Sequence, residues 1–226
     1  MKRFGMIAAV EIGAVKKLYG EPVKKEVAGG FDVYTYVIGD KELFVLHSGV
    51  GEIAAASATQ VLISEYKVEC ILNFGIVGGL TEEMSTVPLC VVEKVVHYPF
   101  DTSAIDHCEV GHYIDEYPTV YMPATPSLVE KVVQEEPSIK KVICASGDKF
   151  VDTAEEKTAI HKQFNADICE MEAAGIVKTA NKNGIPCLCI KMVADTVNGG
   201  AKEYEEVFDS TSETCLKVMD KIMHTL

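Results

Sequence analysis

The sequence predicts an α/β protein in which helices flank a mostly parallel or mixed β-sheet. Short apolar runs rich in β-branched residues recur along the 226-residue chain with little alternation, which is typical of strands buried on both faces. Segments with the apolar spacing of helices separate most of these runs. A chain of this length commonly forms one α/β domain, and neither a linker nor an internal repeat is visible. We therefore predict a single domain over residues 1–226.

Seven apolar runs are predicted to form the core strands of this sheet. They are Phe4–Val10, Leu43–His47, Cys70–Phe74, Val87–Val96, Val142–Ser146, Ala166–Glu170 and Cys187–Ala194. An eighth run, Phe31–Ile38, alternates more clearly between apolar and polar residues. We expect it to pair with Leu43–His47 through a hairpin turn at Gly39 and Asp40.

Five further segments have helical spacing. They are Gly51–Tyr66, Pro126–Glu136, Ala154–Phe164, Ala173–Lys182 and Tyr204–His224. The long segment Tyr98–Tyr121 has no clear period and is rich in Asp, His, Tyr and Gly. Because a long irregular stretch inside a compact domain is usually functional, this segment is a candidate wall of an active site.

The charge balance limits the partners that the protein can have. The formal net charge is −13, whereas a nucleic-acid partner would call for a basic face. Of the 21 basic residues, the only arginine is Arg3. Since bidentate recognition of phosphate is mainly the work of arginine, an arginine phosphate clamp is disfavoured. No apolar stretch approaches the roughly 18 residues of a membrane span, so no membrane partner is expected.

The cysteines and polar clusters do not indicate a disulfide framework or a metal site. Most of the eight cysteines lie in apolar, strand-like runs and none forms a CxxC pair, which predicts reduced thiols and a cytoplasmic protein. One polar cluster has metal-binding residue types but no recognised spacing, and we expect neither a metal nor a cofactor there. Its members are Asp101, Asp106, His107, Cys108, His112 and Asp115.

Four predicted strand ends carry polar or glycine-rich residues. Glu11 follows the first strand, and the run Asn73–Gly79 takes another strand into three glycines. Glu170 and Glu172 close a third strand, and Asp195 closes the last one. Ligands of such sheets gather at the carboxyl ends of the strands, so these residues are the candidate site.

Each of these features also has a purely structural interpretation. The glycines could form a tight strand-to-helix turn, and Glu172 could complement the dipole of the helix that it precedes. If the strand persists, Glu170 and Glu172 would share one face. Asp195 could cap a turn, or it could be a placed acid whose pKa is raised by desolvation.

Taken together, the motifs resemble the purine nucleoside phosphorylase/nucleosidase superfamily. They are Ser48–Gly51 before an alanine-rich helix, Gly75–Leu80, Ser146–Val151, Glu170–Ala173 and Ala194–Asp195. The resemblance covers nearly the whole chain and is greatest to the bacterial 5′-methylthioadenosine/S-adenosylhomocysteine nucleosidases. It implies a single α/β domain whose central, twisted, mixed sheet is partly closed as a barrel and is flanked by helices.

The resemblance also implies roles for individual residues. Asp195 would protonate the imidazole-side ring nitrogen of adenine, and Glu172 would hold the ribose hydroxyls. A smaller group of residues would bind the substrate without taking part in proton transfer. These are Met171 beside the sugar, Phe150 and the Val151 backbone at the base, and the Gly78 backbone.

The chain departs from this family at three positions. Gly13 aligns with the glutamate that activates water in the nucleosidases, and Glu11 is the only carboxylate of that turn. Glu11 is therefore the candidate base, although it could instead be a first-turn glutamate that stabilises a helix over Ile12–Tyr19. Ile76 or Val77 replaces the usual serine, and Lys191 replaces the usual arginine.

These features favour an enzyme that hydrolyses the N-glycosidic bond of an adenine nucleoside and releases adenine and a thioribose. A phosphate-dependent phosphorylase is the alternative enzyme, and a non-catalytic nucleoside-binding protein is the alternative from another class. The expected partner is a small nucleoside. The resemblance implies a homodimer whose partner chain helps to close the 5′ pocket, for which Tyr98–Tyr121 is a candidate.

Overall fold

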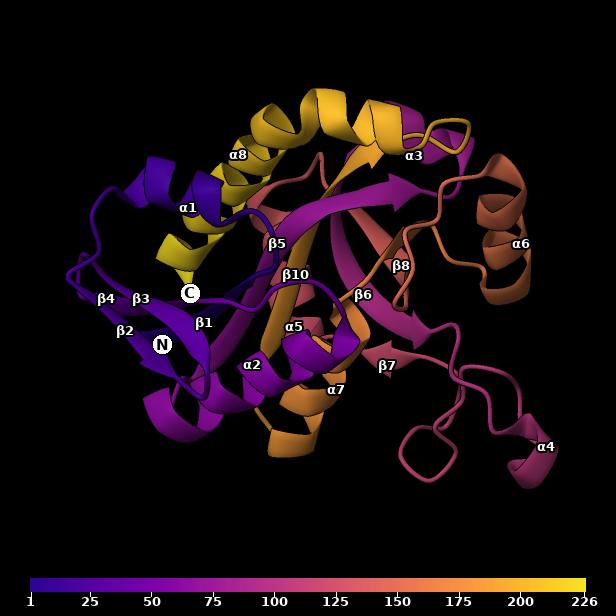
Figure 1. Cartoon of the computed structure of the whole chain (residues 1–226), viewed down its shortest axis with the longest axis horizontal. Coiled ribbons are helices and arrows are strands. Elements are labelled where there is room, and N and C mark those ends of the chain that lie inside the picture. Colours follow the sequence, from indigo (N-terminus) through magenta and orange to yellow (C-terminus); the bar gives the residue numbers. More distant parts are fainter.

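The computed structural model describes residues 1–226 and centres on a ten-stranded mixed β-sheet (Figure 1). The strands are β1 (Arg3–Ala8), β2 (Lys24–Ala28), β3 (Phe31–Ile38), β4 (Lys41–His47), β5 (Cys70–Gly79), β6 (Leu89–His97), β7 (Met122–Pro123), β8 (Lys140–Ser146), β9 (Ile168–Glu170) and β10 (Cys187–Asp195). The helices are α1 (Ile12–Tyr19), α2 (Glu52–Tyr66), α3 (Glu82–Thr86), α4 (Ser103–Asp106), α5 (Pro126–Glu135), α6 (Ala154–Phe164), α7 (Ala173–Asn183) and α8 (Ala201–Thr225).

Five of the strands close on themselves as a small barrel. Strand β5 pairs with β10, β10 with β6, β6 with β8, β8 with β9, and β9 again with β5. The sheet continues from β5 through β1, β4, β3 and β2. Strands β1, β4, β5 and β10 are mutually parallel, so their carboxyl ends meet at one edge. The predicted mixed, partly closed sheet is confirmed.

Helices cover both faces of the sheet. Helices α2 and α7 pack together in one apolar core through residues such as Ala55 and Ile176, and α1, α5 and α8 belong to a second core with Val15, Val129 and Met219. Figure 1 shows α8 and α1 above the sheet and α2 with α7 below it. Each helix is too short or too polar to span a lipid bilayer.

The glycines of the run Asn73–Gly79 do not form a strand-to-helix turn. Gly75, Gly78 and Gly79 all lie inside β5, which continues to Gly79. A Cβ atom at Gly78 would lie 3.0 Å from the Sγ atom of Cys169, and one at Gly79 would lie 3.2 Å from Val193 Cγ1. Glycine is therefore needed where β9 and β10 pack closely against β5.

The other predicted elements are present, with ends shifted by a few residues. The hairpin of Phe31–Ile38 with β4 is confirmed, and Gly39 supplies its positive φ of 64°. Strand β2, strand β7 and helix α3 were not predicted, because they are short and carry little periodic signal. Helix α4 lies within the segment expected to be irregular and, in Figure 1, at a distance from the sheet.

Candidate active site

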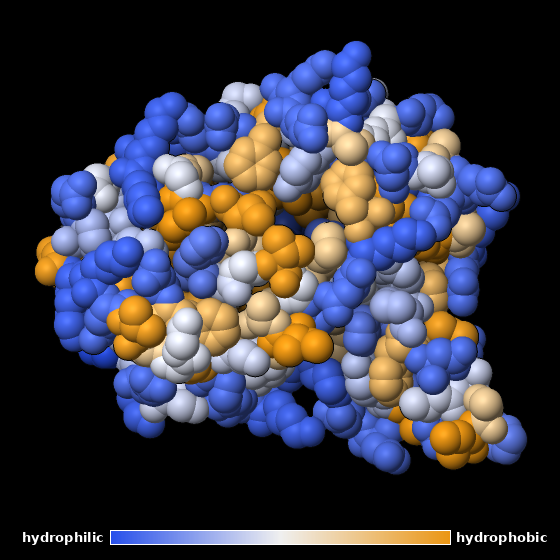
Figure 2. Space-filling view, viewed as in Figure 1, coloured by the Kyte–Doolittle hydropathy of each residue, from blue (hydrophilic) through white to orange (hydrophobic).

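A cavity of about 260 Å³ lies at the carboxyl ends of β1, β9 and β10, beside the second half of β5. Ten of its 16 lining residues are hydrophobic, and Figure 2 shows a hollow rimmed by such side chains near the place where β5 passes in Figure 1. The cavity brings together all the residues that were predicted to take part in catalysis or to contact the substrate. These are Glu11, Gly78, Phe150, Val151, Met171, Glu172 and Asp195.

Asp195 is the last residue of β10 and is only 1% exposed. Its Oδ2 atom forms an ion pair with the ammonium group of Lys157, whereas its Oδ1 atom is buried without a hydrogen-bond partner. Burial raises the pKa of Asp195, and the hydrogen bond and charge of Lys157 oppose this rise. The strand end thus presents one carboxyl oxygen that is free to bond a ligand.

Lys157 was not predicted as part of the site. It is fully buried on α6, where it shares the inner face with Ile160 and Phe164. Its ammonium also donates to the carbonyl oxygens of Thr196 (2.7 Å) and Gly199 (3.0 Å). A lysine at an apolar position of a helix was the signal that could have indicated a buried ion pair.

Glu172 immediately precedes α7, and its side chain is 9% exposed. Strand β9 ends at Glu170, so the condition for a face shared along one strand is not met, yet both carboxylates line the cavity. The amide of Gly51 donates to Glu172 Oε1 (2.9 Å), and the side chain forms no cap bond with its own helix. Burial and the neighbouring charge of Glu170 raise the pKa of Glu172 to about 7.

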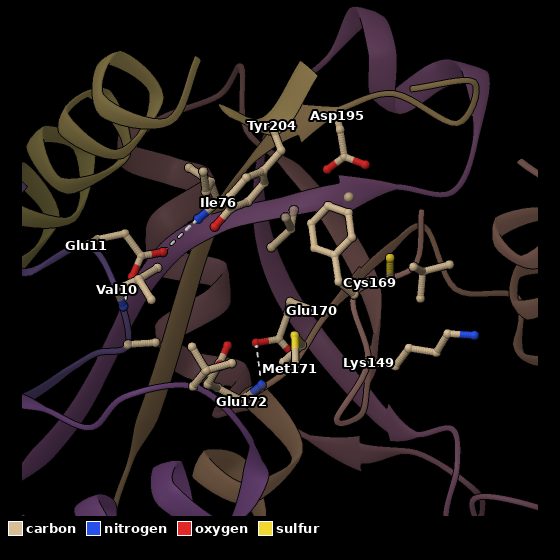
Figure 3. Close-up of a pocket in the computed structure, with 16 residues that line it drawn as sticks. Val10, Glu11, Ile76, Lys149, Cys169, Glu170, Met171, Glu172, Asp195 and Tyr204 are labelled. Atoms are coloured by element: carbon tan, nitrogen blue, oxygen red, sulfur yellow. Dashed lines mark hydrogen bonds between the residues drawn. The ribbon is translucent and has the colours of Figure 1, made fainter. Parts of the chain in front are cut away.

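Glu11 lies between β1 and α1 and is 5% exposed. Its carboxylate accepts hydrogen bonds from the amides of Val10 (3.1 Å) and Ile76 (3.3 Å) (Figure 3). The side chain therefore points across to β5 and does not bond the amides of α1, as a residue serving only that helix would. Gly13 is exposed on α1. Of these two positions, Glu11 is the one that brings a carboxylate into the cavity.

Tyr204 is a lining residue that sequence reasoning missed. It lies in the first turn of α8, and its ring meets that of Phe150 edge-on at 5.4 Å. Burial, followed by the charges of Glu11 and Glu172, raises the pKa of Tyr204 to about 12. The available signal was the pair Tyr204 and Phe208, spaced by one helical turn in an otherwise acidic segment.

The charges around the cavity are mostly negative. Four carboxyl groups line it: Glu11, Glu170, Glu172 and Asp195. The one basic lining residue is Lys149, whose ammonium pairs with Glu156. Behind the wall, Lys191 pairs with Glu170 (3.2 Å). Each lysine close to the cavity is thus already neutralised by a carboxylate.

The segment Tyr98–Tyr121 contributes no residue to this cavity, so its interpretation as a wall of the chain's own site is wrong. Its Tyr113 instead lines a second cavity of about 480 Å³ together with His97, Glu52 and Lys178. The Tyr113 hydroxyl is hydrogen-bonded to His97 Nδ1 (2.7 Å), and the Lys178 ammonium lies 3.6 Å from the centre of its ring, so these contacts hold the segment against β6 and α7. No group of three or more His, Cys, Asp or Glu side chains is arranged to hold a metal ion.

Comparison with known proteins gives one consistent relationship. A sequence model of the phosphorylase superfamily matches residues 3–226. The 5′-methylthioadenosine/S-adenosylhomocysteine nucleosidase of Staphylococcus aureus strain JH9 is 32% identical over 179 residues, which are 77% of this chain and 78% of that protein. The corresponding Helicobacter pylori nucleosidase, solved with butyl-thio-DADMe-Immucillin-A, has a TM-score of 0.92 and 25% identity over 100% of this chain and 99% of the other. A futalosine hydrolase mutant of Helicobacter pylori strain 26695 also has a TM-score of 0.92, with 24% identity and full coverage of both chains.

Proposed function

Because the chain belongs to the phosphorylase superfamily, we propose that it is an N-glycosidase that uses water to release adenine from an adenine nucleoside. The similarity to the Staphylococcus aureus nucleosidase supports 5′-methylthioadenosine and S-adenosylhomocysteine as substrates, with a thioribose as the second product.

The observation that carries this proposal is the convergence of three carboxyl groups on one largely apolar cavity. Glu11, Glu172 and Asp195 come from three different strand ends, and each is more than 90% buried. In the view of Figure 3, Asp195 lies across the cavity from Glu172, and Glu11 lies to one side. A nucleoside between them would have an acid at its base and carboxylates at its sugar.

Asp195 suits the role of the acid at the leaving base. Cleavage of the N-glycosidic bond sends its electron pair into the base, and a proton from Asp195 neutralises that charge. The unpartnered Oδ1 atom is the oxygen that would carry this proton, while Lys157 holds Oδ2. Phe150 and the Val151 backbone line the same cavity and would hold the base in position.

Glu172 and Glu11 suit the sugar side of the reaction. As the bond breaks, positive charge develops on the ribose, and the Glu172 carboxylate stabilises it while holding the hydroxyls. A water molecule then bonds to the anomeric carbon and gives a proton to Glu11, which two backbone amides hold in place. Met171 and the Gly78 backbone complete the contacts with the substrate.

Charge favours hydrolysis over phosphorolysis. A phosphate ion would enter a cavity lined by four carboxyl groups, where Lys149, Lys157 and Lys191 are each paired with a carboxylate. Repulsion from Glu11 and Glu172, the two lining carboxyl groups without a lysine partner, disfavours a dianion, whereas a neutral water molecule meets no such barrier. The carboxylate-rich wall therefore supports water as the nucleophile.

The proposal is tested by comparing two substitutions of the same type. Asp195→Asn removes the transferable proton and should lower turnover of 5′-methylthioadenosine by about 10²–10⁴-fold. Asp209→Asn makes the same change at an exposed position of α8 and should leave turnover unaltered. Equal rates for the two variants would remove Asp195 from the reaction. Tight nucleoside binding without turnover in the unmodified protein would instead indicate a binding protein.

We also propose that the protein works as a homodimer in the cytoplasm. Large apolar side chains outside the core support an interface, because Ile53 on α2 and Ile105 on α4 are 81% and 80% exposed. None of the eight cysteines is in a disulfide, which suits a reducing compartment. Sedimentation equilibrium should show a dimer that Ile53→Glu dissociates and that Val27→Glu, at an exposed position of β2, leaves intact. A monomer at every concentration would contradict the dimer.

A further inference from the structure

Behind the sugar side of the cavity, one serine hydroxyl contacts two buried carboxyl groups. Ser146 Oγ is within hydrogen-bond distance of Glu52 Oε1 and of Glu170 Oε1, the latter at 2.5 Å. The exposed fractions are 0% for Ser146, 7% for Glu52 and 8% for Glu170, so water cannot separate the groups. The hydroxyl also accepts a hydrogen bond from the amide of Ala174 (3.0 Å).

The number of available protons limits how this cluster can be charged. A serine hydroxyl has one proton and can donate it to only one carboxylate. The contact with the second carboxyl group then requires a proton on that group. If both carboxyl groups were ionised, Ser146 Oγ and one carboxylate oxygen would be in contact with no proton between them, and this repulsion is costly in a buried site. One of Glu52 and Glu170 must therefore be a neutral acid.

The surroundings of the two groups identify Glu52 as the neutral one. Glu170 accepts from the Lys191 ammonium (3.2 Å) and from the amides of Glu172 (3.1 Å) and Ala173 (3.0 Å), all of which stabilise a carboxylate. Glu52 has no cation within ion-pair distance and accepts one amide bond, from Gly175 (2.5 Å). Burial, together with the charge of Glu170, raises the pKa of Glu52 to about 8.

We infer that Glu52 is a neutral carboxylic acid in the folded protein and a positioning residue for the sugar side of the active site. It donates a hydrogen bond to Ser146, which in turn donates to Glu170. Glu170 bonds the backbone at the start of α7, and the Gly51 amide next to Glu52 bonds Glu172. The chain of bonds thus fixes both segments that hold Glu172. The positioning role rests on the proposed function, whereas the protonation of Glu52 does not.

Loss of this proton would place a further negative charge beside Glu170 and Glu172 and would break the bond to Ser146. The titratable groups around Glu52 come from every neighbouring element. They are Glu170 at the end of β9, Glu172 just before α7, Lys178 and Lys182 on α7, Lys191 on β10, Asp148 after β8, and His97, Tyr98 and Tyr113 on or after β6. Lys178 and Lys182 both pair with Glu116 (2.5 Å and 3.6 Å), so they do not neutralise Glu52. The second cavity, which Glu52 lines, gives its proton access to solvent.

The test compares Glu52→Gln with the unmodified protein across pH. The amide of glutamine mimics a neutral acid, since it can donate to Ser146 and accept from Gly175. A glutamate that is neutral when folded and ionised when unfolded stabilises the fold at low pH, and this stability is lost as the pH rises towards about 8. The stability of Glu52→Gln relative to that of the unmodified protein should therefore increase between about pH 5 and about pH 8. The ratio of the two folding constants should rise by up to about tenfold per pH unit in this range and should be constant above it.

Further variants keep the inference open to refutation. Glu65→Gln, at an exposed position of the same helix, is the matched control and should leave the folding constant close to that of the unmodified protein. Glu170→Gln should destabilise the fold, because it leaves Lys191 without its carboxylate. If instead Glu170→Gln is harmless and Glu52→Gln is not, the proton resides on Glu170. A pH-independent difference for Glu52→Gln would overturn the inference.

Two readouts separate this inference from the proposed function. The infrared difference spectrum between the unmodified protein and Glu52→Gln at neutral pH should contain the carbonyl band of one protonated carboxyl group, whatever the protein catalyses, and its absence would overturn the inference. If Glu52 also positions Glu172, the alkaline limb of kcat/KM for 5′-methylthioadenosine should move to higher pH in Glu52→Gln. An unmoved limb would refute the positioning role alone. A protein without turnover would refute the proposed function but leave the infrared result standing.

Discussion

Replacing Lys157 with Met should lower the free energy of unfolding by about 3–5 kcal/mol at neutral pH. Lys157 is fully buried, and its ammonium contacts Asp195 Oδ2 and the carbonyl oxygens of Thr196 and Gly199. Methionine fills most of the same space but makes none of these contacts. The variant therefore leaves the Asp195 carboxylate buried without a cation.

The magnitude follows from the burial of both partners. The side chains of Lys157 and Asp195 are 0% and 1% exposed, so the remaining charge cannot regain its hydration. Removing one partner of such a pair typically costs about 3–5 kcal/mol, against a total of about 5–15 kcal/mol for a folded protein. The loss of about a fifth or more of the stability is thus expected.

The loss should also depend on pH, because Asp195 can take up a proton in place of its cation. Burial raises the pKa of Asp195 and Lys157 opposes this rise, so the pKa will be higher still in Lys157→Met. A carboxyl group with a raised folded-state pKa contributes stability at low pH that is lost as the pH rises through that pKa. The variant should therefore lose less stability at about pH 5 than at about pH 8.

Urea denaturation at both pH values measures this effect. Asp195→Asn in the Lys157→Met background removes the unpaired charge and should recover part of the lost stability. Lys162→Met, at an exposed position of the same helix, is the matched control and should stay within about 0.5 kcal/mol of the unmodified protein. An equal loss at both pH values, or a double variant no more stable than Lys157→Met, would refute the reasoning.

Three further predictions concern the cavity. Glu172→Gln should lower kcat with only a modest change in KM, because the Glu172 carboxylate acts most strongly on the cationic transition state. A change in KM alone would show that Glu172 only binds the substrate. Glu11→Gln should lower turnover by about a hundredfold or more with an unchanged melting temperature, and a fully active variant would require another base. Gly78→Ala would place a Cβ atom 3.0 Å from Cys169 Sγ and 3.4 Å from Asp195 Oδ2. Because this atom would displace the Asp195 carboxyl group, turnover should fall by roughly tenfold or more while the protein still folds. An undiminished rate would show that the cavity wall at Gly78 tolerates the displacement.

The sequence predicted the site well where the chemistry lies at strand ends. Glu11, Glu172 and Asp195 each lie at or just after the end of an apolar run. The parallel strands β1, β5 and β10 bring Glu11 and Asp195 to one edge, whereas β9, antiparallel to β5, brings Glu172 to the same cavity from the opposite direction. The hairpin of Phe31–Ile38 and the helix Ala154–Phe164 could be predicted because turn chemistry and apolar spacing are local signals. Local signals of this kind require no knowledge of distant contacts.

The supporting residues were missed because their partners are distant in the sequence. Lys157 meets Asp195 from 38 positions away, and Glu52 meets Ser146 from 94 positions away. Each occupies an apolar-face position of its helix, which signals burial but does not identify a partner. The sequence left a turn open as the structural alternative for the glycines of β5, because the close approach of β9 and β10 is a tertiary effect that the local pattern does not show.

Hydrolysis by water is tested most directly by product analysis with 5′-methylthioadenosine, in phosphate-free buffer and in buffer with added inorganic phosphate. We predict that free adenine forms at the same rate in both, together with an unphosphorylated methylthioribose, because four carboxyl groups line the cavity and its nearby lysines are paired. Adenine release that requires phosphate, with the sugar recovered as its phosphate ester, would contradict the account.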